Sequence, residues 1–122
     1  NLKKYINVAK NAGATPVLAT PVSRRLFNSS GEIVNTYTDY CTAMAEVAKE
    51  TQTILIDLCQ KSKDLLEGYG DENSKKLFMI FGPGEYPNYP EGLTDNTHFN
   101  YEGAKKIASL VVEGLLENNI NL

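Results

Sequence analysis

The sequence has only two cysteines, one histidine and no long hydrophobic run among its 122 residues. Its longest apolar stretch lies around residues 107–112 and is far shorter than the ~20 residues needed to cross a bilayer, so no membrane span is expected. Cys41, Cys59 and His98 do not supply the three or four ligands of a metal site, and two cysteines make no disulfide framework. We therefore expect two free, buried thiols and no bound metal ion.

Positive charge is also scarce in this sequence. Twelve lysines and arginines face fifteen acidic residues, which gives a formal net charge of −3. The basic doublets are scattered along the chain, and no stripe alternates basic residues with aromatic ones, as a track for a phosphate backbone would. Nucleic acid is therefore not an expected partner.

Length and composition indicate one folded domain at most. A chain of 122 residues falls within the ~100–200 residues typical of a single domain. Its hydrophobic fraction of 42% is close to that of ordinary soluble domains and excludes intrinsic disorder. The sequence shows neither an initiator methionine nor a signal peptide, and it starts directly in an amphipathic pattern. We expect residues 1–122 to be part of a longer domain.

Hydrophobic periodicity predicts that helices alternate with strands. Apolar residues at helical spacing predict helices over residues 2–12 and 36–50, a helix through 62–69 that ends at Gly70, and a last helix beginning near Asn100. Continuous apolar runs predict buried strands over 16–20 and 53–58, residues 77–81 are ambiguous, and 82–92 are expected to be a loop. This order predicts an α/β fold in which two parallel strands have helices on both faces. The residues that the last helix should bury are Ala104, Ile107, Ala108, Val111 and Leu115.

The most informative segment for function is 93–100, which we expect to be a loop leading into the last helix. It contains Asp95 and, three residues later, the single histidine, His98. This spacing suits a carboxylate that accepts the imidazole Nδ1–H and leaves Nε2 free as a general base. The alternative is a surface histidine beside a helix start, with Asp95 bonded to local backbone.

A nucleophile is harder to find in the sequence. Ser23 stands just past the first predicted strand, where a nucleophile could lie, but no Gly-x-Ser-x-Gly elbow surrounds it. A hydrogen bond from Ser23 to loop backbone is the expected role.

Four blocks of the sequence resemble a known family. The segment 94–99, Thr-Asp-Asn-Thr-His-Phe, is similar to the last Asp-x-x-His block of the SGNH (GDSL-type) hydrolases. Residues 20–25, residues 56–58 and residues 76–92, with their Tyr-Pro-Asn-Tyr-Pro loop, narrow the resemblance to bacterial rhamnogalacturonan acetylesterases, which deacetylate pectin. The resemblance covers essentially the whole chain.

The resemblance implies a three-layer α/β/α, flavodoxin-like fold and a secreted carbohydrate O-acetylesterase that needs no cofactor. His98 would be the general base and Asp95 its orienting partner. The family's Gly-Asp-Ser nucleophile block and Gly-x-Asn-Asp oxyanion block do not occur in this sequence. Residues 1–122 would therefore be the C-terminal half of the fold, and this chain alone is expected to be inactive.

An acetylated polysaccharide would be the substrate. Arg24 would bind a carboxylate of an acidic sugar or brace neighbouring loops. Tyr86 and Tyr89 would stack on sugar rings or pack their loop down. Two other functions stay open: a GDSL esterase or lipase acting on another acyl ester, and a non-catalytic flavodoxin-like interaction domain in which Asp95 and His98 merely cap a helix. The outer edge of the strand at Val17 is expected to pair with a second copy or with the missing N-terminal half.

Overall fold

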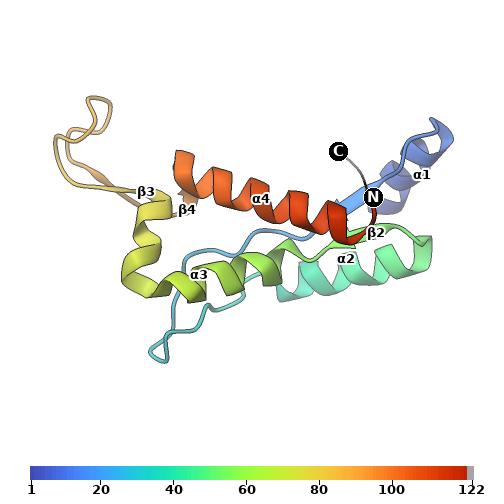
Figure 1. Ribbon diagram of the computed structural model, residues 1–122, viewed down its shortest axis with the longest axis horizontal. Helices are drawn as coiled ribbons and strands as arrows, with labels where there is room; N and C mark the ends of the chain where they lie inside the picture. The colour runs from blue at the N-terminus through green and yellow to red at the C-terminus, as the bar shows by residue number, and fades with distance from the viewer. Residues whose placement is uncertain (121–122) are drawn as a thin grey trace.

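The computed structural model describes residues 1–120 and shows an α/β chain in which helices alternate with short strands (Figure 1). Strands β1 (Val17–Ala19) and β2 (Ile54–Ile56) are parallel neighbours, in a register that places Leu18 beside Leu55. This arrangement confirms the predicted α/β fold with a parallel pair. The elements in chain order are α1 (Leu2–Asn11), β1 (Val17–Ala19), α2 (Thr38–Thr51), β2 (Ile54–Ile56), α3 (Leu58–Ser74), the 3-10 turn η1 (Lys75–Leu77), β3 (Phe78–Phe81), β4 (Leu93–Phe99) and α4 (Tyr101–Glu117).

The carboxyl ends of the two parallel strands are tied together by polar side chains. The backbone N–H of Thr20 donates to the carbonyl of Ile56 at 3.0 Å, and its hydroxyl donates to Asp57 Oδ1 at 3.1 Å. The same Asp57 carboxylate accepts from the backbone N–H of Gln60 at 3.1 Å and caps the N-terminus of α3. Helix α3 therefore starts as soon as β2 ends, and Leu58, predicted as strand, is its first residue.

Glycines set the ends of two helices. Gly13 follows α1 with a φ of +76°, the left-handed conformation expected at that position. Gly70 lies inside α3 with φ 74° and ψ 168°, so the helical path stops there as predicted. A second helical stretch then continues to Ser74, which the sequence did not predict.

The segment 93–99 is a strand, and its prediction as a loop was wrong. Strand β4 runs antiparallel to β3, with Leu93 beside Phe81 and Phe99 beside Phe78. The ambiguous segment is thus strand over 78–81, and the loop 82–92 connects the two strands as a hairpin that projects from one end of the molecule (Figure 1). The antiparallel pair was missed because the polar residues of β4 show no strand alternation.

Helix α4 packs through its glycines. Gly103 and Gly114 are its buried residues, whereas Ala104 and Ala108, predicted as buried, are exposed. A Cβ on Gly114 would lie 2.5 Å from a methyl carbon of Ile56, so this glycine lets the helix axis approach β2 closely. The larger residues predicted for the buried face, Ile107, Val111 and Leu115, are half-buried.

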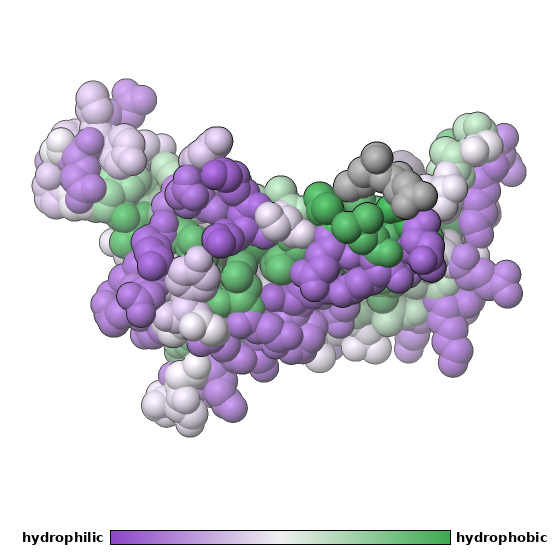
Figure 2. All heavy atoms as spheres, in the orientation of Figure 1, coloured by the Kyte–Doolittle hydropathy of each residue, from purple (hydrophilic) through white to green (hydrophobic). Residues whose placement is uncertain are grey.

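The core lies between α3 and the start of the hairpin. Leu66 and Phe78 are almost fully buried there and contact Ile33 and Leu77. Other apolar residues stay at the surface, including Val112 and Leu116 near the end of α4, where Figure 2 shows a hydrophobic area. No helix within residues 1–120 is long and apolar enough to span a membrane.

Candidate active site

The Asp95-x-x-His98 segment forms a bulge in β4. Ile80 pairs with Thr94 and Phe78 pairs with Phe99, so four residues of β4 stand opposite the single residue Met79. Extra residues on one side of an antiparallel pair are forced out of the ladder, and such bulges are common beside active sites. The bulge therefore lifts Asp95 and His98 out of the sheet.

Asp95 organises the bulge through three short hydrogen bonds. Its Oδ1 accepts the backbone N–H of Thr97 at 2.7 Å and that of His98 at 3.0 Å. Its Oδ2 lies 2.7 Å from His98 Nδ1. The predicted contact between Asp95 and the imidazole is present, and the local backbone bonds offered as its alternative are present as well. The Asp95 carboxylate accepts both kinds of hydrogen bond at once.

These hydrogen bonds favour the ionised carboxylate. The backbone N–H and imidazole of His98, together with the N–H of Thr97, lower the pKa of Asp95 to about 2 from an ordinary 3.8. An ionised carboxylate only accepts hydrogen bonds, so Nδ1 of His98 must carry the proton that it donates. Nε2 of the neutral ring is then an acceptor, and the imidazole side chain is 77% exposed. This is the protonation pattern of a general base.

The bulge is attached to the loop that leaves the carboxyl end of β1. The backbone N–H of Arg25 donates to the carbonyl of Asn96 at 3.0 Å. In parallel sheets, ligands bind outside the carboxyl ends of the strands. Asp95 and His98 therefore lie on the side of the sheet where an active site is expected.

Ser23 is not available as a nucleophile. Its side chain is buried, and its Oγ donates to the carbonyl of Cys59 at 3.0 Å. Its backbone N–H donates to Ser62 Oγ at 2.9 Å. Ser23 thus joins the loop after β1 to α3: its role is structural, as expected, but its backbone partner lies in a helix and not in the loop.

Arg24 is exposed on the loop after β1, and its guanidinium lies 5.6 Å from the ring centre of Tyr37. Its side chain takes part in none of the hydrogen bonds found among residues 1–120, so the contact with Tyr37 is its tie to another segment. The bracing role belongs to the next residue, Arg25, which the sequence analysis did not single out. The signal for Arg25 was weak because its partners are distant in sequence.

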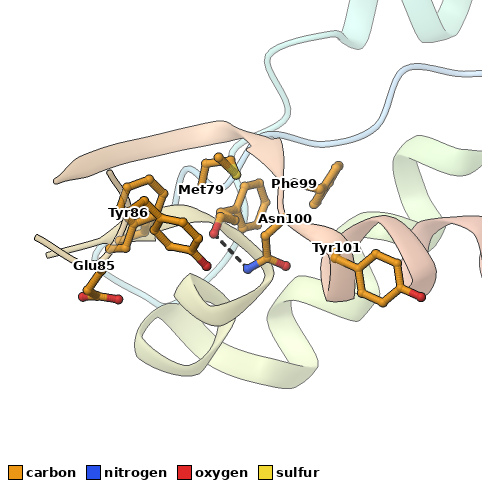
Figure 3. Close-up of a pocket in the computed structure, with 9 residues that line it drawn as sticks. Met79, Glu85, Tyr86, Phe99, Asn100 and Tyr101 are labelled. Carbon is orange, nitrogen blue, oxygen red and sulfur yellow. Dashed lines mark hydrogen bonds between the residues drawn. The ribbon is translucent and has the colours of Figure 1, made fainter. Parts of the chain in front are cut away.

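Tyr86 and Tyr89 both pack on Phe81, with ring centres 4.5 Å and 5.4 Å from it. Both residues nevertheless stay partly exposed, 54% for Tyr86 and 40% for Tyr89. Only Tyr86 lines the open pocket of about 370 Å³ beside the hairpin, together with Glu85 and Tyr101 (Figure 3). Packing of the loop is therefore observed for both tyrosines, and Tyr86 also faces a space that a ligand could occupy.

The cysteines lie away from this chemistry. Both are free, with Cys59 buried and Cys41 half-buried. Burial, followed by a hydrogen bond to Cys59, raises the pKa of the Cys41 thiol to about 11. Among residues 1–120, no three His, Cys, Asp or Glu side chains gather closely enough to hold a metal ion.

Two curated proteins of Bacillus subtilis (strain 168) match this chain. Rhamnogalacturonan acetylesterase RhgT is 46% identical over 121 residues, which cover 99% of this chain and 52% of RhgT. The probable rhamnogalacturonan acetylesterase YesY is 39% identical over 121 residues, which cover 99% of this chain and 51% of YesY. The chain is similar to rhamnogalacturonan acetylesterases along nearly its whole length. The resemblance found in the sequence is confirmed, and the chain spans about half the length of these relatives.

A solved structure shows the same fold. The crystal structure of protein YxiM from Bacillus subtilis superposes with a TM-score of 0.79 and 28% identity, covering 98% of this chain and 30% of that one. No family model matches the sequence.

Proposed function

We propose that this chain supplies the acid–base part of a carbohydrate O-acetylesterase, with His98 as general base and Asp95 as its orienting partner. The observation that carries the proposal is the 2.7 Å contact between Asp95 Oδ2 and His98 Nδ1, on an imidazole whose side chain is 77% exposed. Both relatives are named rhamnogalacturonan acetylesterases, which supports acetylated rhamnogalacturonan as the proposed substrate. Action outside the cell is proposed with it, because the substrate is a polymer.

The proposed reaction is acyl transfer through a serine located outside residues 1–122. His98 Nε2 accepts the serine hydroxyl proton while the serine oxygen attacks the acetyl carbon, and it then gives that proton to the departing sugar oxygen. In the second half, Nε2 accepts a proton from water, and the water oxygen attacks the acyl-serine. Acetic acid leaves and ionises to acetate in the solvent, and the serine oxygen regains the proton from Nε2. Asp95 stays ionised throughout and stabilises the imidazolium.

The helix-capping alternative for Asp95 and His98 does not agree with the structure. Asn100 is the N-cap of α4, because its side-chain oxygen accepts the backbone N–H of Gly103 at 3.0 Å. Asp95 instead bonds within the bulge. A GDSL esterase acting on another acyl ester would use the same Asp95–His98 pair. The substrate assay must therefore distinguish it from a carbohydrate acetylesterase.

The test is acetate release by the complete translated protein that contains this chain. With acetylated rhamnogalacturonan, His98→Ala should lower kcat by roughly 10³-fold or more, as for other enzymes that lose a triad base. Ser23→Ala is the matched control and should keep its activity, because Ser23 is buried against α3. Full activity of His98→Ala would contradict the proposal. A preference for a lipid ester over the acetylated polymer would favour the second esterase class.

Two residues are proposed to contact the polymer. The exposed guanidinium of Arg24 suits a uronate carboxylate, and the ring of Tyr86 suits a sugar face. Arg24→Met and Tyr86→Ala should raise KM for the polymer while leaving hydrolysis of p-nitrophenyl acetate unchanged. Tyr89 should matter less, because it lines no part of the pocket in Figure 3. Equal losses on both substrates would refute a role in polymer binding.

A further inference from the structure

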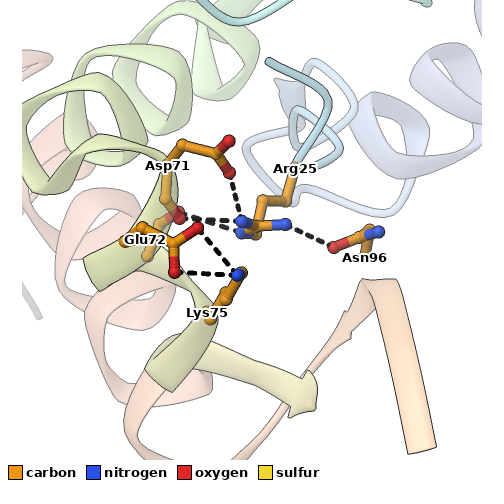
Figure 4. A network of polar contacts seen from close by, with 6 residues as sticks. Arg25, Asp71, Glu72, Lys75 and Asn96 are labelled. Carbon is orange, nitrogen blue, oxygen red and sulfur yellow. Dashed lines mark hydrogen bonds and ion pairs between the residues drawn. The ribbon is translucent and has the colours of Figure 1, made fainter. Parts of the chain in front are cut away.

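Arg25 is a buried arginine whose side-chain nitrogens are all hydrogen-bonded (Figure 4). Its Nε donates to Ser74 Oγ at 3.0 Å, and its Nη1 donates to Asn96 Oδ1 at 2.7 Å. Its Nη2 donates to the carbonyl of Asp71 at 2.7 Å and forms an ion pair with the Asp71 carboxylate. Only 7% of the Arg25 side chain is exposed.

These contacts join three segments that are far apart in sequence. Arg25 lies on the loop after β1, while Asp71 and Ser74 belong to the stretch of α3 beyond the break at Gly70. Asn96 is inside the bulge, between Asp95 and Thr97, and is held twice: by the Arg25 side chain and, at 3.0 Å, by the Arg25 backbone N–H.

The bulge needs such an anchor. Its residues have left the register with β3, and Asp95 ties them only to one another. These local bonds fix the shape of the turn but do not connect it to the rest of the molecule. The bonds from Arg25 to Asn96 supply that connection.

We propose that Arg25 is a positioning residue that holds the Asp95–His98 pair in place through Asn96. The catalytic meaning of this role rests on the function proposed above, but the structural claim does not. An arginine suits the position because its planar fork reaches acceptors on three residues in fixed directions, which a lysine ammonium on a flexible stem does not do. The ion pair with Asp71 offsets the cost of burying the guanidinium.

The tautomer of His98 reports this role directly. In the wild-type chain, we expect the neutral ring to be mainly the Nδ1–H form, because the Asp95 carboxylate accepts that proton. If the bulge loosens, the pair separates for part of the time and the Nε2–H form grows. Long-range ¹H–¹⁵N correlations distinguish the two forms, and His98 is the only histidine of the chain.

The experiment uses the ¹⁵N-histidine-labelled chain at about pH 8.5, where an imidazole is ordinarily neutral. Arg25→Met should lower the ratio of Nδ1–H to Nε2–H roughly two- to tenfold, the factor expected when one ordinary hydrogen bond is lost. Asn96→Ala should lower it less: both variants lose the bond between the two side chains, but only Arg25→Met also loses the contacts with Ser74 and Asp71 that hold the loop after β1 in place. Arg24→Met is the matched control and should leave the ratio unchanged. Leu66→Val controls for a general loss of stability.

Each outcome tells whether Arg25 positions the Asp95–His98 pair or only stabilises the fold. The proposal is supported if the ratio of Nδ1–H to Nε2–H falls in Asn96→Ala, falls further in Arg25→Met and keeps its wild-type value in both controls. A wild-type ratio in Arg25→Met and Asn96→Ala overturns it, as does an equal fall in Leu66→Val or a wild-type ring without a tautomer preference. If Arg25→Met does not fold, the exposed Asn96→Ala variant decides by itself. The measurement needs no substrate, so its result stands even if the esterase proposal fails.

Discussion

Replacing Gly103 by alanine should destabilise the chain by displacing the first turn of α4. A Cβ at this position would lie 2.0 Å from the carbonyl oxygen of Leu77, and 2.9 Å from an aromatic carbon of Phe99. An ordinary contact begins at 3.4 Å, so the helix must retreat from a backbone atom by more than an ångström. That movement would strain the 3.1 Å bond from Asn100 N–H to the same carbonyl.

The expected size follows from three contributions. Overpacking of a close contact costs about 1–3 kcal/mol. Weakening of the Asn100 cap costs about 1 kcal/mol, and the better helix propensity of alanine returns about 1 kcal/mol. The free energy of unfolding should therefore fall by about 1–3 kcal/mol, measured as a lower midpoint of urea unfolding.

The matched control is Gly68→Ala on the exposed side of α3. A Cβ at Gly68 meets no atom within 4 Å, so only the helix propensity changes. This variant should gain up to about 1 kcal/mol. If Gly103→Ala unfolds at the same or a higher urea concentration than Gly68→Ala, the close approach of α4 to Leu77 is refuted.

Three other predictions concern acid, thiol chemistry and association. Because the pKa of Asp95 falls from 3.8 to about 2, its stabilising contribution should be present above pH 3.8 and lost as the pH falls through about 2. NMR shifts of the backbone N–H of His98 should show this, and titration near pH 4 would contradict it. The raised pKa of Cys41, about 11, should slow its alkylation at neutral pH roughly a hundredfold relative to an ordinary thiol, and mass spectrometry after iodoacetamide would reveal any faster reaction. Within residues 1–120, β1 pairs only with β2, so we expect the chain to dimerise through the free edge of β1 and Val17→Lys to reduce the dimer seen in sedimentation. A wild-type monomer at high concentration would argue against this edge.

Local interactions account for most of what the sequence predicted. The helices, each of the two buried strands, the left-handed Gly13 and the Asn100 cap depend on residues within a few positions of one another. The Asp95–His98 contact belongs to the same class, because its partners are three residues apart. Such features can be inferred from spacing alone. The pairing of β1 with β2 joins distant residues and was inferred from the alternation of helices and strands.

Contacts between particular residues that lie far apart in the sequence were not predicted. Arg25 and Asn96 are separated by 71 positions, and nothing near either residue announces the bond between them. The glycine contacts of α4 likewise depend on where Leu77 and Ile56 lie after folding. The hairpin was missed because four consecutive bulged residues interrupt the alternation by which a strand is recognised.

The bulge has a consequence for how a complete catalytic site would be assembled. Its carboxylate, its imidazole and the two backbone N–H groups that orient them lie within four consecutive residues. The proposed base and its partner are therefore brought together by one short segment, and the bonds from Arg25 to Asn96 keep that segment from loosening. A complete site then needs one further alignment, that of this segment with the segment that carries the nucleophile. The two bonds from Arg25 to Asn96 then help to set the direction in which the proposed base points.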